Sequence, residues 1–167
     1  MRSLRLLVLV GALGVGVAAA PAVAATSPTQ RLSFTVQFAA RSKTTHAIGA
    51  SGSVVYGQLD FVGPSTVNGQ AATVELQSNV FYTRGSGPFD GWVTVTMADG
   101  SVLGVEMVGG RTKAQPDTTD ASFTAKLVVF GGSGRFVSAK GTGSMTGSRK
   151  ASLGGTVNLS FRLSFRT

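Results

Sequence analysis

The chain has 167 residues, contains no cysteine, and carries fifteen Lys and Arg against seven Asp and Glu, a formal net charge of +8. The length corresponds to one domain, and the absence of cysteine excludes a disulfide framework, thiol catalysis and thiolate metal sites. The basic residues are scattered without a long run of like charge, which favours a solvated basic surface over a specific nucleic-acid site.

Residues 1–25 have the pattern of a cleavable signal peptide. Arg2 and Arg5 precede an apolar run over residues 6–17, and Ala22-Val23-Ala24 matches the small-x-small pattern found before a cleavage site. The apolar run is shorter than the ~20 residues of a membrane-spanning helix, so export is favoured over a membrane anchor. We therefore expect a secreted protein in which residues 26–167 form one domain without a transmembrane segment.

Alternating apolar and polar residues predict three strands in the first half of this domain. Residues 31–39 form the first strand, and residues 40–51, which include the only histidine, His46, are predicted to be a polar loop. Residues 53–62 form the second strand, which Gly63-Pro64 should end. Asn68-Gly69 predicts a tight turn before residues 70–83, a long strand with Tyr82 on its apolar face.

The second half of the domain predicts five more strands. Asp99-Gly100 is typical of a hairpin turn between strands at residues 92–97 and 102–108, with loops at residues 84–90 and 111–120. After a strand at residues 122–130, the segment 131–147 (GGSGRFVSAKGTGSMTG) predicts a short turn or a single turn of helix at residues 133–139 and then a strand at residues 141–147. At least one of Gly132 and Gly134 should have a positive φ.

The last strand, residues 156–166, has the strictest alternation in the chain. Its apolar face should be buried, because a slip of one residue in register would expose every one of these side chains. The face consists of Val157, Leu159, Phe161, Leu163 and Phe165.

Eight strands without an amphipathic helix predict an all-β fold, either an eight-stranded antiparallel β-barrel of calycin-like type or a β-sandwich. The barrel is favoured because closure removes the exposed edges that such strands would otherwise present. The interior of a barrel of ~8 strands is either filled by side chains or holds one small ligand.

The glycine-rich segment is similar to one in a known family. Residues 129–136 (VFGGSGRF), followed by residues 139–143 (AKGTG), resemble the glycine signature of allene oxide cyclase and dirigent-type barrels, in which such a segment joins two late strands. Residues 56–61 (YGQLDF) are similar to the glycine-acid-phenylalanine strand of the same family. The resemblance implies a bacterial-type secreted barrel that binds a hydrophobic small molecule in its lumen. Some members steer a cyclisation or a radical coupling, and the resemblance assigns no catalytic residue to this chain.

Five residues are candidates for a ligand site. Tyr56 and Asp60 share one strand face and are predicted to form the polar end of the lumen. There a hydroxyl and a carboxyl group could hold a carbonyl or hydroxyl group and move a proton, so they are also the candidate catalytic pair. Glu106 is a second acid within a strand, and burial would raise its pKa. Tyr82 and Trp92 could line an apolar mouth. The alternative for the two acids is an exposed position or one at the barrel mouth.

Cofactor and metal chemistry are not predicted. His46 has no second histidine or cysteine for a metal site and no readable partners for a Ser-His-Asp arrangement. The segment GGSGRF lacks a Walker lysine and no long helix follows it, so its glycines indicate backbone geometry rather than phosphate binding.

The leading functional prediction is a secreted barrel that binds a small molecule, with cofactor-free cyclisation, isomerisation or dirigent-type steering as a further step. The alternative is a non-catalytic barrel that acts through its surface, in the cell envelope or on an acidic polysaccharide. The oligomeric state is left open.

Overall fold

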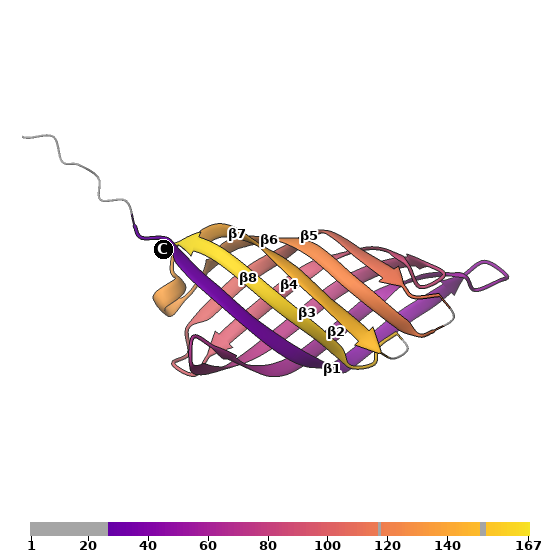
Figure 1. Cartoon of the computed structure of the whole chain (residues 1–167), viewed down its shortest axis with the longest axis horizontal. Coiled ribbons are helices and arrows are strands. Elements are labelled where there is room, and N and C mark those ends of the chain that lie inside the picture. Colours follow the sequence, from indigo (N-terminus) through magenta and orange to yellow (C-terminus); the bar gives the residue numbers. More distant parts are fainter. Residues whose placement is uncertain (1–26, 117, 151–152) are drawn as a thin grey trace, which may run out of the picture.

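The computed structural model describes residues 27–116, 118–150 and 153–167, so the predicted leader at residues 1–25 lies outside the described part. Eight antiparallel strands close into one barrel in chain order, with the last strand pairing back to the first (Figure 1). The strands are β1 (Gln30–Ile48), β2 (Val54–Val67), β3 (Gln70–Thr83), β4 (Gly87–Met97), β5 (Val102–Ala114), β6 (Asp120–Gly132), β7 (Lys140–Lys150) and β8 (Val157–Arg166). The prediction of an eight-stranded barrel is confirmed.

The core lies inside the barrel and consists of the inward apolar side chains of the strands. All five apolar residues of β8 are buried, as the alternation predicted, and the four of β1 opposite them are buried too. Phe34 and Phe161 are partners across the seam between β1 and β8, and their rings stack with centroids 5.0 Å apart. Full burial of one such side chain contributes roughly 1.5–3 kcal/mol, so the seam is a main source of stability.

Strand β7 contributes almost no side chains to the core. Its inward positions are Gly141, Gly143, Met145, Gly147 and Arg149, in line with its burial pattern. A Cβ atom at any of these three glycines would collide with the backbone of β8 and with inward side chains there. The glycine repeat therefore lets β7 lie close to β8, whose large side chains occupy the space inside.

One end of the barrel is closed by the segment between β6 and β7. This segment contains the 3-10 helix η1 (Gly134–Phe136), so of the two predicted forms it adopts the helical turn, and Gly134 has the predicted positive φ, +59°. Phe136 is 2% exposed and packs edge-on against Phe165, with ring centroids 6.0 Å apart. The amide groups of Ser133 and Arg135 donate hydrogen bonds to Val102 O and Ser101 Oγ, 2.8 and 3.2 Å long, which hold η1 against β5.

Strand β1 is longer than predicted, because residues 40–48 are strand rather than loop. The ladder with β8 ends at Phe38↔Val157, whereas the ladder with β2 runs from Ala39↔Val62 to Ile48↔Val54. The paired ends of β1 and β2 project at the end of the barrel opposite η1 (Figure 1). Most side chains of this part of β1 are exposed on both faces, which explains a sequence polar enough to resemble a loop.

Strand β2 passes through Gly63-Pro64, where the sequence predicted a stop. The ladder with β1 ends at Ala39↔Val62, while the ladder with β3 continues to Val67↔Gln70. Pro64 therefore lies on a stretch that pairs on one side only, where its missing N–H group interrupts no bond to β1. The Ser65 hydroxyl donates a 2.8 Å hydrogen bond to Thr35 O and bridges the two strands there.

Strand β5 is also longer than predicted, since it continues to Ala114 through a bulge at Gly109 and Gly110. The register with β6 shifts between Val108 and Arg111, and Gly109 has a φ of +62°. The bulge changes which residues face inward, from Met107 before it to Thr112 after it. A polar side chain is thereby directed into the barrel.

Candidate functional site

An apolar cavity of about 40 Å³ lies inside the barrel, away from the end that η1 closes. Aromatic and aliphatic side chains from most of the strands form its walls, among them Phe38, Phe61, Met107, Phe123 and Met145. A water molecule needs at least ~10–15 Å³ of such space, so this volume accommodates a few waters or a small apolar group. Buried apolar side chains of the core occupy the lumen around this cavity.

Tyr82 on β3 and Arg149 on β7 are polar residues that line the cavity, and Thr112 on β5 lies next to Tyr82. Tyr82 is 4% exposed, and its phenolic oxygen accepts a 2.8 Å hydrogen bond from Thr112 Oγ1. Gly87, the first residue of β4, pairs with Thr112, and a Cβ atom there would collide with the carbonyl oxygen of Phe81. Burial raises the pKa of Tyr82, and the hydrogen bond from Thr112 and the charge of Arg149 oppose that shift.

Arg149 is the only charged residue among the buried polar residues of the described chain, and it is 6% exposed. Its guanidinium carbon lies 5.9 Å from the centroid of the Phe123 ring, a cation–π contact. Its Nε atom is buried and has no hydrogen-bond partner among the described residues. Burial lowers the pKa of Arg149, while the phenolic group of Tyr82 and the carboxylate of Asp120 act in the opposite direction.

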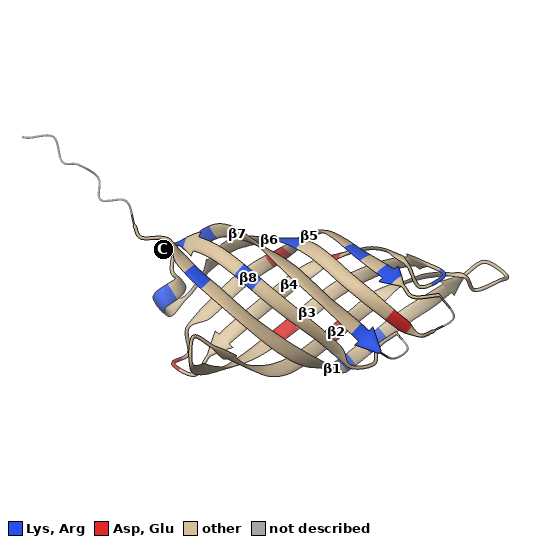
Figure 2. Cartoon of the chain, viewed as in Figure 1, with Lys and Arg blue, Asp and Glu red and all other residues tan. Residues whose placement is uncertain are grey.

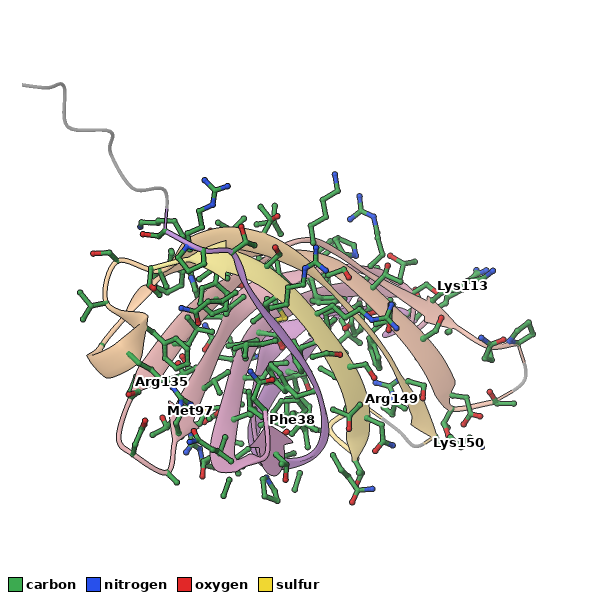
Figure 3. All side chains as sticks on the ribbon, turned by 60° about the vertical axis from the view of Figure 1, so that its left-hand side comes forward. Phe38, Met97, Lys113, Arg135, Arg149 and Lys150 are labelled. Atoms are coloured by element: carbon green, nitrogen blue, oxygen red, sulfur yellow. The ribbon has the colours of Figure 1, made fainter. Side chains whose placement is uncertain are left out.

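The cavity adjoins a depression of about 600 Å³ at the rim of the barrel. Tyr82, Arg149 and Leu153 line both spaces, and the depression is bordered by residues of the β3–β4 and β5–β6 connections. Figure 3 shows Arg149 and Lys150 toward one end of the barrel and Met97 and Arg135 toward the other. A molecule bound at this rim could thus contact Arg149 and Tyr82 and extend an apolar group inward.

Of the five residues predicted to bind a ligand, only Tyr82 faces the lumen. Tyr56 and Trp92 are 46% and 50% exposed, and Asp60 and Glu106 also lie on the outer face. The prediction that Tyr56 and Asp60 form the polar end of the lumen is wrong. In β2, Leu59 and Phe61 occupy the inner face, and alternation then places their neighbours outside.

On the outer face, Asp60 belongs to an ion-pair network. Arg41 Nε lies 2.8 Å from Asp60 Oδ2, and Arg41 Nη1 lies 2.6 Å from Glu75 Oε1. These two carboxylates, Asp60 first, raise the pKa of Arg41. The network links β1, β2 and β3 at the point where β1 has left its pairing with β8, which gives Asp60 a structural explanation.

A second depression, of about 500 Å³, lies on the outer face beside Trp92. Its other lining residues are mainly polar and include Gln58, Asp60, Gln77 and Asn79. Asn79 Nδ2 donates a 2.9 Å hydrogen bond to Asp90 Oδ1. An exposed indole ring next to amide groups offers an apolar face together with hydrogen-bond donors and acceptors.

Sequence reasoning missed Thr112 and Arg149. Thr112 lies where a loop was predicted, and Arg149 was grouped with the scattered basic residues, which Figure 2 shows spread along the ribbon. A signal for Arg149 exists, since it follows Met145 by four positions and so shares the inward face of β7. Charged residues are usually exposed, and for this reason Arg149 was expected on the surface.

Comparisons of the chain with models of protein families, with curated proteins and with solved structures gave no match. Within the described part of the chain, no helix is long and apolar enough to cross a membrane.

Proposed function

We propose that this protein binds a small, mainly apolar molecule at the end of its barrel opposite η1, which is called the open end below. The observation that carries the proposal is the asymmetry of the lumen. Phe136 fills the end at η1, whereas the other end keeps an apolar cavity that adjoins a surface depression at Tyr82 and Arg149. An apolar cavity with a few convergent polar groups at its mouth is the usual form of a small-molecule site.

The size of the cavity restricts the ligand. A volume of about 40 Å³ takes only a small group without rearrangement. Met107 and Met145 line it, and because methionine is unbranched and flexible, a longer tail can enter if they change rotamer. The ligand is therefore compact or has a flexible chain, and each Å² of apolar surface that it buries contributes roughly 25 cal/mol.

Secretion and catalysis belong to the same proposal. The leader pattern of residues 1–25 supports export, and the resemblance of residues 129–143 to allene oxide cyclase and dirigent-type barrels supports steering of a cyclisation or coupling. Such steering needs a dry site that holds the substrate in one conformation. The polar groups available for it are those of Tyr82 and Thr112, not the predicted Tyr56 and Asp60.

The test is a thermal-shift and calorimetric screen of apolar alcohols, phenols, carbonyl compounds and acids. Ser78 is buried and lines the cavity, so Ser78→Leu should fill it, abolish binding and leave the melting temperature unchanged or higher. Asp60→Asn and Tyr56→Phe on the outer face are the matched controls, and both should bind as the wild type does. Binding that survives Ser78→Leu, or no binding by the wild type, would overturn the proposal.

The depression beside Trp92 supports the alternative of a barrel that acts through its outer surface. Aromatic faces next to amide groups suit sugar rings, so neutral and acidic polysaccharides belong in the same screen. Retention on a polysaccharide that Trp92→Ala abolishes and Arg149→Met leaves intact would favour this alternative, because Arg149 lines the lumen cavity and not the depression beside Trp92.

A further inference from the structure

We infer that the ligand of the open end is an organic acid, whose carboxylate pairs with Arg149 while its apolar part occupies the cavity. This inference rests on the proposed function and names the chemical class of the ligand. The observation behind it is the state of the Arg149 side chain, which is 94% buried (6% exposed) and lines the cavity, and whose Nε atom has no partner within the described chain.

A buried arginine without an anion is an unfavourable arrangement. Transfer of a guanidinium group out of water is compensated only when an opposite charge and hydrogen bonds replace its hydration. The Phe123 ring supplies a cation–π contact at 5.9 Å, which satisfies none of the N–H donors. A methionine or leucine at position 149 would extend the apolar wall, so stability alone does not explain the arginine.

The described chain offers Arg149 no carboxylate within ion-pair distance. The ion pairs that it does contain involve Arg41 with Asp60 and Glu75, and Arg135 with Asp99. Asp120 contributes attraction to Arg149 but is the ladder partner of Lys150, whereas the residue opposite Arg149 is Ala121. Asp117 lies outside the described residues and is tested directly below.

A carboxylate fits the donors at this place. The planar guanidinium fork presents parallel N–H groups that match the two oxygens of a carboxylate, and such charge-assisted bonds are the strong ones in proteins. The Tyr82 hydroxyl accepts from Thr112, so its own hydrogen remains available to the same ligand group. The apolar cavity beyond Arg149 then takes the other end of the acid.

The experiment compares matched acids and neutral analogues by calorimetry. The pairs are hexanoate with methyl hexanoate, octanoate with octanol, and 3-phenylpropanoate with its amide. The wild type should bind each acid at least about tenfold more tightly than its neutral analogue. Arg149→Met should remove that preference without weakening the neutral compounds, and Arg149→Lys should keep part of it.

Stability without ligand separates this role from a structural one. If Arg149 is unpaired until an external anion binds, the Arg149→Met variant should melt at the same temperature as the wild type or higher, because the substitution removes an unpaired buried charge. Asp117→Asn is the control for an internal partner and should change neither the melting temperature nor the preference for acids.

The outcomes that overturn the inference are distinct from failure of the proposed function. Equal affinity for acids and neutral analogues would reject the acid and leave the lumen site standing, whereas no binding of either class would reject the site itself. Destabilisation of Arg149→Met and Asp117→Asn by a similar amount would identify an internal ion pair and reject the inference.

Discussion

The two ends of this barrel are built from the same alternating strands, but the inward-facing residues nearest to each end differ in polarity. At the closed end these residues are apolar and almost fully buried, as Val67, Met97 and Leu103 show, and Phe136 of η1 packs against Phe165 there. At the open end three of them are polar, Tyr82, Thr112 and Arg149, and two of these, Tyr82 and Arg149, line the cavity.

The comparison shows that residues near the strand ends and in the connections decide whether an end of the barrel is closed and apolar or polar with a cavity. The strands as a whole do not decide it. In an up-and-down barrel all odd-numbered strands finish at the same end, and the three polar residues lie near the C-terminal ends of β3, β5 and β7. Residues far apart in the chain, at spacings that no local motif would reveal, thus meet around one opening.

The largest expected effect comes from opening the closed end. Phe136→Ala should destabilise the protein by about 3–5 kcal/mol, because it removes a fully buried ring and leaves a cavity beside Phe165. Chemical denaturation measures the change. Ligand affinity at the other end should stay the same in the fraction that is folded, and a loss of less than about 1 kcal/mol would show that η1 does not seal the barrel.

A smaller effect is expected from the turn that carries Phe136. Gly134→Ala should cost more than about 1 kcal/mol, since the residue has a φ of +59° and its new Cβ would collide with the Ser101 side chain. The control is Gly100→Ala, at a φ of +80° with open space around its Cβ position. Denaturation midpoints should fall further for Gly134→Ala, and equal losses would mean that the contact with Ser101 adds nothing.

The smallest effect concerns the polar end. Tyr82→Phe leaves the Thr112 hydroxyl without its partner and should cost about 1 kcal/mol at neutral pH. Burial raises the pKa of Tyr82 in the folded state, so the unfolded tyrosine loses its proton first, near its ordinary value of about 10. Stability contributed by the neutral phenol is therefore complete below about pH 10 and falls as the pH rises above it.

The measurement is the free energy of unfolding as a function of alkaline pH. The wild type should lose up to about 1.4 kcal/mol per pH unit more than Tyr82→Phe above pH ~10. Other groups titrate in both proteins, so the difference between the two curves isolates Tyr82. Parallel curves would contradict a buried neutral phenol at this position.

These residues also show how far sequence reasoning reached. The inward faces of β1 and β8 were predictable because one side of each strand is wholly apolar, so only one assignment buries it. In β2 both faces are mixed, and the choice that put Tyr56 and Asp60 inside was wrong. There the size of Leu59 and Phe61 decides which face packs into the core.

The site was less predictable than the fold for two physical reasons. Thr112 faces inward because Gly109 and Gly110 form a β-bulge, which shifts the alternation by one residue. The alternation pattern alone does not predict such a bulge. Arg149 lies at an inward position of β7. Charged residues are almost never fully buried unless they are paired, and this rule led to the expectation that Arg149 lies on the surface. Tyr82 was found because five alternating residues of β3 agree on one face.

The seam between β1 and β8 has a kinetic consequence. Its ladder runs from Gln30↔Phe165 to Phe38↔Val157, so the pairing that closes the barrel joins residues from the two ends of the described chain. Contacts of such high sequence separation are formed at a large entropic cost, and all-β chains dominated by them fold in roughly milliseconds to seconds. Until β8 has been made and has docked, β1 presents Leu32, Phe34, Val36 and Phe38 on an unpaired edge. An arrested or truncated chain that lacks β8 should therefore self-associate through β1 and β7 rather than persist as an open sheet.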